Sequence, residues 1–249
     1  MPVSEMYDSK PILLLTRPQT ASEQFWQSLP EEVRTRSRLI LSPLLEIVPV
    51  GKPAPLQPGT AAIFTSANAV ACFAAPVAAG AAAYCVGQAT RAAAETAGWQ
   101  AECLGETAEE LLSALSGQRP GPMVHLRGRH IRTDLAGRLA AAGLTCGEQV
   151  VYDQRLLPLN KSALMALAGP EPVIVPLFSP RTARQFAETA GDLVNVTAIT
   201  LSEAVADPLK TRDLAGLSCA ARPDAKAMRK AVTEAIERLC RVEGTGGAH

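Results

Sequence analysis

Short apolar runs recur along the chain and constrain its fold more than any other feature. Each ends in a small or hydroxyl residue, and most are followed by helix-like sequence. This alternation is typical of strands and helices that build a mostly parallel sheet. We predict ten strands, five in each of two lobes: ILLLTRP from Ile12, RLILSP from Arg38, AAIFTS from Ala61, AYCVG from Ala83, AECLG near Cys103, MVHLRG from Met123, QVVYD from Gln149, VIVPLFSP from Val173, VTAITLS from Val196 and GLSCAARP from Gly216.

Three helix starts are marked by their chemistry. Ser179 followed by Pro180 predicts an N-cap with proline at the first helical position, and Thr16-Arg17-Pro18 predicts a similar start. Thr107 with Glu110 fits a capping box. Because Pro176 cannot donate to a sheet ladder, we expect a bulge or a sheet edge at that point of its strand.

The predicted strands fall into two similar sets that run in different orders. Three successive units of the first half match three in the second at a nearly constant separation, whereas the two remaining strands precede them in one set and follow them in the other. The second set is therefore predicted to be a circular permutation of the first. The matched segments are Phe64-Thr65-Ser66 with Phe178-Ser179-Pro180, Val86 with Ile199, Cys103 with Cys219, residues 11–15 with 122–126, and RLILSPLLEI with EQVVYDQRLL.

This permutation predicts how the chain is divided. Lobe one takes residues 1–44 and 156–249, and lobe two takes residues 45–155. The chain passes between the lobes twice, along extended segments at about 42–50 and 152–159. A length of 249 residues also favours two modest domains. We expect a ligand in the cleft between them.

Composition excludes several classes of function. The formal net charge is zero, so there is no overall attraction to nucleic acid or to an anionic membrane. No stretch is long and apolar enough to span a bilayer, and the start lacks a signal sequence, so we expect a cytoplasmic protein. The six cysteines and three histidines show no metal-ligand spacing, and buried thiols are the favoured interpretation. GxGxxG, GxxxxGK[ST] and GxSxG motifs are absent.

Candidate ligand contacts lie where the predicted strands end. In open parallel sheets, ligands bind beyond the carboxyl ends of the strands. Each hydroxyl there could equally be an ordinary helix cap, and Arg127 and Arg129 could be anion contacts or solvated side chains; a solvated helix face explains Arg132 and Arg138 better. The strand ends offer Thr16-Arg17, Thr65-Ser66, Gly87 with Thr90, Arg127-Gly128, Tyr152, Ser179 and Ser202.

The chain resembles the uroporphyrinogen-III synthase family over most of its length. IFTSANAV together with VGQATRAAAETAG at this spacing is the most specific part. The turn ITLSEAV departs from the glycine-containing turn common in the family, which puts the backbone contact near Ser202 in doubt. The other resembling segments are LLLTRP, PLLEI, LRG with AAGL, VVYD, FSPRTARQF and ARPDAKAM.

The resemblance implies a fold, a reaction and a site. The fold is α/β, with two flavodoxin-like lobes joined by a two-stranded β-ladder. The enzyme is a lyase of tetrapyrrole biosynthesis that dehydrates and cyclises hydroxymethylbilane to uroporphyrinogen III, inverting ring D through a spiro intermediate without metal or cofactor. Tyr152 matches the family's cleft tyrosine, a donor to the leaving hydroxyl. The substrate-binding positions would be Arg17, Thr65, Ser66, Ala67, Gly87, Thr90, Arg127, Gly128, Ser179, Pro180 and Ser202.

We expect a monomer that binds its tetrapyrrole substrate and makes at most transient contact with the preceding pathway enzyme. Two other interpretations compete with the synthase. A non-catalytic two-lobed ligand-binding module would share the architecture, which alone does not define a function. A nucleotide-dependent α/β enzyme would need the phosphate loops that this sequence lacks.

Overall fold

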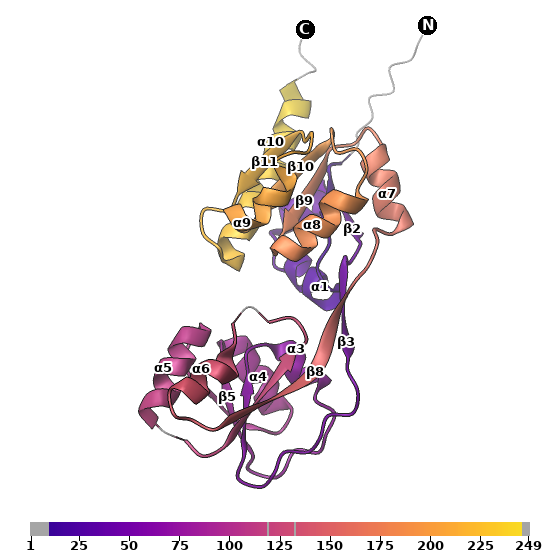
Figure 1. The fold of residues 1–249 in the computed structure, drawn as a ribbon. Helices are drawn as coiled ribbons and strands as arrows, with labels where there is room; N and C mark the ends of the chain where they lie inside the picture. The colour runs from indigo at the N-terminus through magenta and orange to yellow at the C-terminus, as the bar shows by residue number, and fades with distance from the viewer. Residues whose placement is uncertain (1–9, 119, 132, 246–249) are drawn as a thin grey trace, which may run out of the picture. The chain divides into compact units, whose positions relative to one another are not determined.

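A computed structural model describes residues 10–118, 120–131 and 133–245 (Figure 1). The chain divides into two compact units. The first takes the chain up to Glu46 and from Leu156 onward, and the second is Ile47–Arg155. Each unit is an α/β body with its own sheet, as the sequence predicts. All strand pairs whose register is recorded are parallel.

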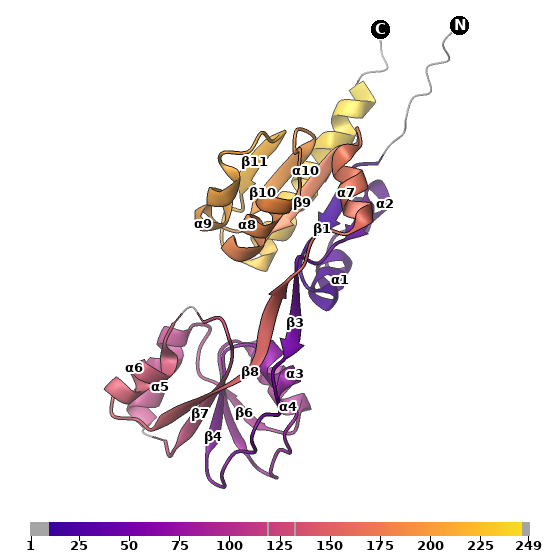
Figure 2. The ribbon, with the colours of Figure 1, turned by 45° about the vertical axis from the view of Figure 1, so that its right-hand side comes forward.

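The first unit is built on a five-stranded sheet in the order β11-β10-β9-β1-β2. Strands from opposite ends of the chain meet in it, so the indigo β1 lies beside the orange β9 (Figure 2). The strands are β1 (Ile12–Leu15), β2 (Arg38–Leu41), β9 (Val173–Leu177), β10 (Val196–Thr200) and β11 (Gly216–Cys219). The helices are α1 (Gln19–Gln27), α2 (Glu31–Arg36), α7 (Lys161–Ala168), α8 (Pro180–Thr189), α9 (Glu203–Ala206), the 3-10 turn η1 (Asp207–Leu209) and α10 (Ala225–Thr245).

Alternation along β1 divides the core of this unit into two layers. Ile12 and Leu14 pack with α7, α8 and α9, whereas Leu13 and Leu15 pack with α1, α2 and α10. All four side chains are fully buried, which explains why the strand is a continuous apolar run in the sequence.

The second unit is built on a six-stranded sheet in the order β3-β8-β7-β4-β5-β6. Its two cores lie on opposite faces, with α3 and α4 covering one and α5 and α6 the other. The strands are β3 (Leu45–Pro49), β4 (Ala61–Phe64), β5 (Ala82–Cys85), β6 (Gln100–Cys103), β7 (Met123–Gly128) and β8 (Cys146–Leu156). The helices are α3 (Ala67–Cys72), α4 (Gln88–Thr96), α5 (Ala108–Gln118) and α6 (Leu135–Ala141).

The strand orders of the two units confirm the permuted duplication. The first sheet has the order 2-1-3-4-5 when its strands are numbered along the chain, the flavodoxin-like order. The second sheet gives the same spatial order if β7 and β8 take the places of β1 and β2 and β4, β5 and β6 those of β9, β10 and β11. The capped helix starts align Ser66, not Thr65, with Ser179.

Strand β3 is additional to the ten predicted strands and lies at the edge of the second sheet. It neighbours β8, and the pairing is antiparallel, because the amide of Val50 donates to Val151 while the amide of Leu157 donates to Leu44. The chain therefore leaves the first unit along β3 and returns along β8.

Two local predictions are wrong. Strand β9 lies in the middle of its sheet and keeps a continuous register with β10, so Pro176 marks neither an edge nor a bulge. Pro176 has no backbone N–H to donate. This is tolerated because the recorded pairing of β9 with β1 ends at Ile174. Thr16 does not cap α1, whose N-cap position is Pro18 without a side-chain hydrogen bond.

Two other helix starts follow the predicted chemistry. The hydroxyl of Ser179 accepts from the amide of Thr182, with Pro180 in the first turn of α8. Thr107 accepts from the amide of Glu110, and the carboxylate of Glu110 accepts from the amide of Glu106. The capping box thus reaches one residue further back than its usual pattern.

Asn160 joins α7 to the end of β2 by hydrogen bonds, which yields a prediction about the first unit. Its side chain caps α7 at the amide of Ala163 and donates to the carbonyl of Leu41 at 2.7 Å. Asn160→Ala should lower the free energy of unfolding of this unit by about 1 kcal/mol, and Asn160→Ser, which keeps the cap alone, by roughly half of that.

The measurement is urea unfolding in a Trp99→Phe background. Trp26 of the first unit is then the remaining tryptophan, because the chain has two. Equal midpoints for the parent and Asn160→Ala would show that these bonds contribute nothing.

Candidate functional site

Five of the predicted positions in the second unit lie at one edge of its sheet. Strands β8, β7, β4 and β5 are neighbours in that order, and parallel strands end at the same edge. Gly128 ends β7, Thr65 and Ser66 follow β4, Gly87 follows β5, and Tyr152 lies within β8 opposite Gly128. The fold therefore brings together residues that are up to 87 positions apart in the sequence, as Tyr152 and Thr65 are.

The sequence predicts that a strand ends at Tyr152. In the structure β8 continues to Leu156. Tyr152 lies where β7 ends. The register there shifts, with Arg127 opposite Val150 but Gly128 opposite Tyr152, so β8 carries one extra residue. A bulge of this kind turns the strand and re-aims its side chains. Val151 and Tyr152, though adjacent, consequently pack in the same core, against α3 and α4.

The phenol of Tyr152 is held in a nearly closed environment. Tyr152 is 6% exposed. Burial raises the pKa of the phenol above its ordinary value, and the neighbouring hydroxyl of Ser66 partly opposes the rise. The hydroxyl of Ser66 also accepts from the amide of Asn68 at the start of α3, so its own proton is available to the phenol oxygen. If Ser66 donates this proton to the phenol oxygen, the phenol proton is left for another acceptor.

Gly128 is required by the position of the tyrosine ring. A Cβ atom at residue 128 would lie 2.6 Å from Cζ and 2.9 Å from the hydroxyl of Tyr152. Any side chain would therefore displace the ring. We infer that Gly128 shapes the site by being small.

The remaining predicted positions of this unit line the helix starts. Ala67 is the first residue of α3 and is half-buried. Gly87 caps α4 with a φ of 78°, a conformation that favours glycine. Thr90 lies in the first turn of α4 but is only 6% exposed, so it is less accessible to a ligand than the exposed Thr65.

A buried histidine stands behind Thr65. His125 of β7 is 2% exposed, and its Nε2 lies 3.3 Å from the hydroxyl of Thr65. Its Nδ1 has no hydrogen-bond partner and lies 3.8 Å from Oε1 of Glu148, the residue opposite it on β8. Burial lowers the pKa of the imidazole from 6.5 to about 4, against an opposing effect of Glu148. Sequence reasoning missed this group, because only the strand register brings its three members together.

The arginines at the end of β7 already have carboxylate partners. Arg127 donates to Oε2 of Glu148 at 2.8 Å and to the carbonyl of Gly128, and Arg129 donates to Asp153 at 2.8 Å. Arg138 pairs with Glu109 on the surface. Arg132 lies outside the described residues. A substrate carboxylate would therefore have to compete with Glu148 or Asp153 for Arg127 or Arg129.

The first unit offers a different set at the ends of β1, β9 and β10. The guanidinium of Arg17 lies 4.4 Å from the ring centroid of Phe178, and burial lowers its pKa from the ordinary value. Among the described residues it has no carboxylate partner. Ser179 and Pro180 start α8, and the hydroxyl of Ser179 is used as a cap. Ser202 starts α9, and its hydroxyl makes no capping bond.

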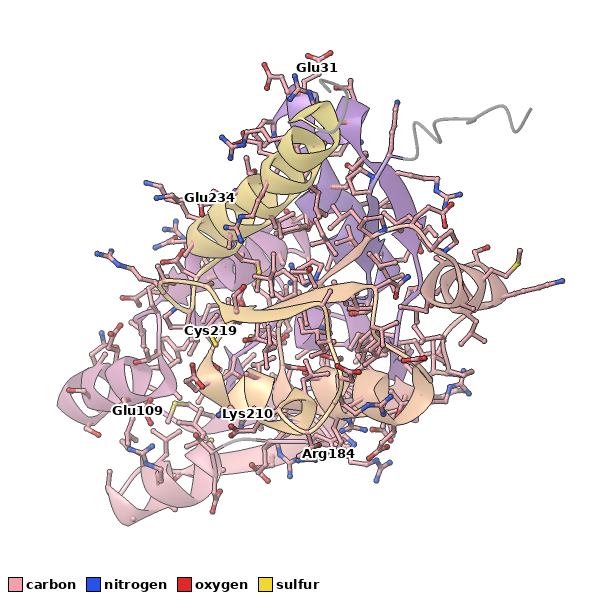
Figure 3. The ribbon with its side chains drawn as sticks, turned by 90° about the horizontal axis from the view of Figure 1, so that it is seen from above. Glu31, Glu109, Arg184, Lys210, Cys219 and Glu234 are labelled. Atoms are coloured by element: carbon pink, nitrogen blue, oxygen red, sulfur yellow. The ribbon has the colours of Figure 1, made fainter. Side chains whose placement is uncertain are left out.

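The cysteines show no reactive arrangement within the part of the chain that the structure describes. All six are free, and Cys72 and Cys85 are buried as expected, whereas the others are partly exposed. Cys219 and Lys210 are labelled in Figure 3. The thiol of Cys219 contacts the carboxylate of Glu203, which also pairs with Lys210. Burial raises the pKa of this thiol, so it remains protonated and a weak nucleophile. No cluster of three metal-ligating side chains occurs among the described residues, and none of their helices combines the length and apolarity needed to cross a bilayer.

Comparison with known proteins assigns the family. The model of the uroporphyrinogen-III synthase HemD family matches residues 37–230. This chain belongs to that family. It is accordingly a lyase of tetrapyrrole biosynthesis that makes uroporphyrinogen III from hydroxymethylbilane.

Solved structures of family members are similar to this chain. Uroporphyrinogen-III synthetase from Helicobacter pylori is 22% identical, with 91% of this chain and 99% of that chain covered and a TM-score of 0.64, a likeness that shows the shared fold. Uroporphyrinogen III synthase from the extremely thermophilic bacterium Thermus thermophilus is 16% identical, with 92% and 99% covered and a TM-score of 0.39. A search of curated proteins gives no match.

The buried His125 of this synthase predicts how its second unit responds to acid. The folded-state pKa of about 4 lies below the unfolded value of about 6.5, so the unfolded state binds more protons between these values. The second unit should therefore lose about 3 kcal/mol of stability as the pH falls from 6.5 to 4 through this group alone. His125→Leu should flatten that part of the profile.

The test is urea unfolding at several pH values in a Trp26→Phe background, where the fluorescence of Trp99 reports the second unit. Thr60→Val serves as a control that leaves the histidine in place. Parallel pH profiles for the parent and His125→Leu would contradict the prediction.

Proposed function

We propose that Tyr152 is the catalytic residue of this synthase and donates its phenol proton to the departing hydroxyl of hydroxymethylbilane. The proposal rests on the environment of the phenol. Ser66 is placed to donate to the phenol oxygen, which leaves the phenol proton directed at a different acceptor. The raised pKa keeps that proton in place near neutral pH until the leaving oxygen accepts it.

The proposed first step is the loss of water from the substrate. The carbon–oxygen bond of the hydroxymethyl group breaks, the oxygen leaves as water with the proton of Tyr152, and the pyrrole stabilises the cation that remains as an azafulvene. That cation is attacked by the substituted carbon of the final ring, which gives the spiro intermediate. The bond between the spiro carbon and its original bridging carbon then breaks, and that bridging carbon bonds instead at the free α-carbon of the same ring. The proton of this α-carbon is lost as the ring regains aromaticity, and it returns to the phenolate. A positioned general acid contributes a rate factor on the order of 10² to 10⁴.

Much of the catalysis would be control of conformation. The azafulvene can close without help, but it then joins at the unsubstituted carbon and gives the uninverted isomer. The protein must therefore hold the ends of the chain so that only the substituted carbon reaches the cation. Unpaired amides at the helix starts and nearby hydroxyls are suited to the substrate carboxylates. The residues proposed to bind the substrate are Arg17, Thr65, Ser66, Ala67, Gly87, Thr90, Arg127, Gly128, Ser179, Pro180 and Ser202.

Arg17 is the arginine best suited to bind a substrate carboxylate. Arg127 and Arg129 are occupied by Glu148 and Asp153, whereas Arg17 is stacked on Phe178 and has no carboxylate partner among the described residues. Stacking fixes the plane of the guanidinium while its N–H groups stay available for a bidentate contact.

We also propose that the enzyme works in the cytoplasm as a monomer, with at most transient contact to the preceding pathway enzyme. Six free cysteines are in keeping with a reducing compartment. Large exposed apolar side chains are few among the described residues, and such scattered exposure is ordinary for a monomer. A sedimentation experiment on the purified protein tests the oligomeric state.

Removing the phenol hydroxyl should slow the reaction without unfolding the protein. Tyr152→Phe is expected to lower kcat on the order of 100-fold, because the acid is lost while the ring still fills its place. The assay supplies hydroxymethylbilane generated in situ and separates the type I and type III isomers after oxidation. Unchanged kcat would remove Tyr152 from the mechanism.

Gly128→Ala is the companion variant, since it keeps the phenol but displaces it. It should lower kcat at least as far as Tyr152→Phe. A wild-type enzyme that yields only the type I isomer would contradict the assigned activity itself.

Arg17 and Arg129 make a matched pair for carboxylate binding. Arg17→Gln should raise KM about 10-fold with kcat within about twofold, because a charge-assisted contact to the substrate is lost. Arg129→Gln should change KM by less than about twofold, since that arginine is exposed and already paired. Steady-state kinetics with hydroxymethylbilane decide the matter, and the reverse ranking would place the carboxylate at the second unit.

A further inference from the structure

We propose that His125 is a positioning residue, which fixes the hydroxyl of Thr65 as a hydrogen-bond acceptor for a pyrrole N–H of the substrate. The inference rests on the proposed binding of the substrate at the strand ends of the second unit. It changes the expected role of Thr65, since a hydroxyl in that position would otherwise be expected to donate to a carboxylate.

The tautomer of the His125 imidazole decides which nitrogen can accept a hydrogen bond. A neutral histidine has one N–H and one bare nitrogen, and its surroundings decide which is which. Oε1 of Glu148 lies 3.8 Å from Nδ1, and no donor satisfies that nitrogen. A bare Nδ1 would place a lone pair against a carboxylate in a buried setting, whereas Nδ1–H directs its positive end at the carboxylate. The proton therefore belongs on Nδ1.

The carboxylate of Glu148 has a second partner. Oε2 of Glu148 accepts from Arg127 at 2.8 Å, which leaves Oε1 facing the imidazole. The other titratable side chain near the backbone of His125 is Cys146, whose thiol is neutral because burial raises its pKa to about 11. Glu148 is thus the negative group that orients the ring, and Arg127 anchors Glu148.

The tautomer determines what Thr65 can offer. With the proton on Nδ1, Nε2 is an acceptor, so the hydroxyl of Thr65, 3.3 Å away, must donate its proton inward. Thr65 is exposed, and only its lone pairs remain for a ligand. Ionised carboxylates are acceptors and gain nothing from such a group. The pyrrole N–H groups of a tetrapyrrole are donors and match it.

The adjacent hydroxyls of Thr65 and Ser66 would then have opposite roles, one as a hydrogen-bond acceptor and the other as a donor. Thr65 accepts from the substrate, whereas Ser66 donates to the phenol of Tyr152. A pyrrole held at Thr65 would lie one residue from the serine that directs the catalytic proton. This places the reacting end of the substrate, rather than a carboxylate side chain, at the end of β4.

The tautomer can be measured without substrate. The intact protein is labelled with ¹⁵N-histidine, and couplings between ring nitrogens and carbon-bound protons report which nitrogen carries the proton. The chain has three histidines, and the signal lost in His125→Leu identifies the one in question. We expect Nδ1–H. The Nε2–H tautomer would overturn the inference and leave the proposed role of Tyr152 intact.

A double-mutant cycle then tests the action through Thr65. Thr65→Val should raise KM about fivefold with kcat little changed, whereas Thr65→Ser should keep the KM of the parent. Thr60→Val, at the other end of β4, should have no effect. His125→Leu should raise KM in the parent but not in the Thr65→Val background. Equal effects in both backgrounds would mean that the histidine acts only through packing, and the proposal would fail.

Two further outcomes separate this inference from the proposed function. If Thr65→Val affects kcat alone, the group bound is the departing hydroxyl, which overturns the assignment to a pyrrole N–H. If Thr65→Val is silent while Tyr152→Phe slows the enzyme, the site is correct and the role of Thr65 is wrong. If both variants are silent, the proposed site itself fails and the inference with it.

Discussion

The register between β7 and β8 is the constraint on which the candidate site depends. Parallel pairing sets the two strands side by side from Met123 to Arg127, and one extra residue on β8 then shifts the pairing to Gly128 opposite Tyr152. Without the bulge, Tyr152 would point to the face opposite that of Val151. With it, the phenol reaches Ser66 at the start of α3. A backbone irregularity therefore brings residues from two strands and a helix together into the group proposed to donate the proton.

The same pair of strands carries the charged groups behind the site. In regular register, His125 faces Glu148, and Arg127 reaches the same carboxylate from two residues further along β7. The carboxylate of Glu148 is half-buried, with a guanidinium on one oxygen and an imidazole near the other. These partners offset the cost of burying its negative charge without a charged histidine. The consequence is the sensitivity to acid expected of any imidazole buried in neutral form. Regular pairing thus positions His125, Arg127 and Glu148, and the irregular pairing at its end positions Tyr152, the proposed proton donor.

The sequence predicted the fold well because its signals are local. Apolar runs such as ILLLTRP and hydroxyl caps such as Ser179 depend on neighbouring residues, and the permuted order follows from comparing such segments. The site was predicted less completely. The bulge at Val151 and the approach of His125 to Thr65 depend on register, which no local pattern states. The prediction for Pro176 failed for the same reason, since its tolerance depends on where the pairing with β1 ends.

Duplication of the unit did not duplicate its chemistry. Ser66 and Ser179 occupy equivalent caps, yet Ser66 is directed at a phenol, whereas Ser179 hydrogen-bonds to Thr182 within its own helix. In the first unit, the end of β1 carries Arg17 on an aromatic ring, and in the second the equivalent strand, β7, ends at Gly128 to admit Tyr152. A cation suits binding of an anionic substrate, and a buried phenol suits delivery of a proton. In the proposed mechanism, divergence at equivalent strand ends separates carboxylate binding from acid catalysis, although both units keep one sheet order.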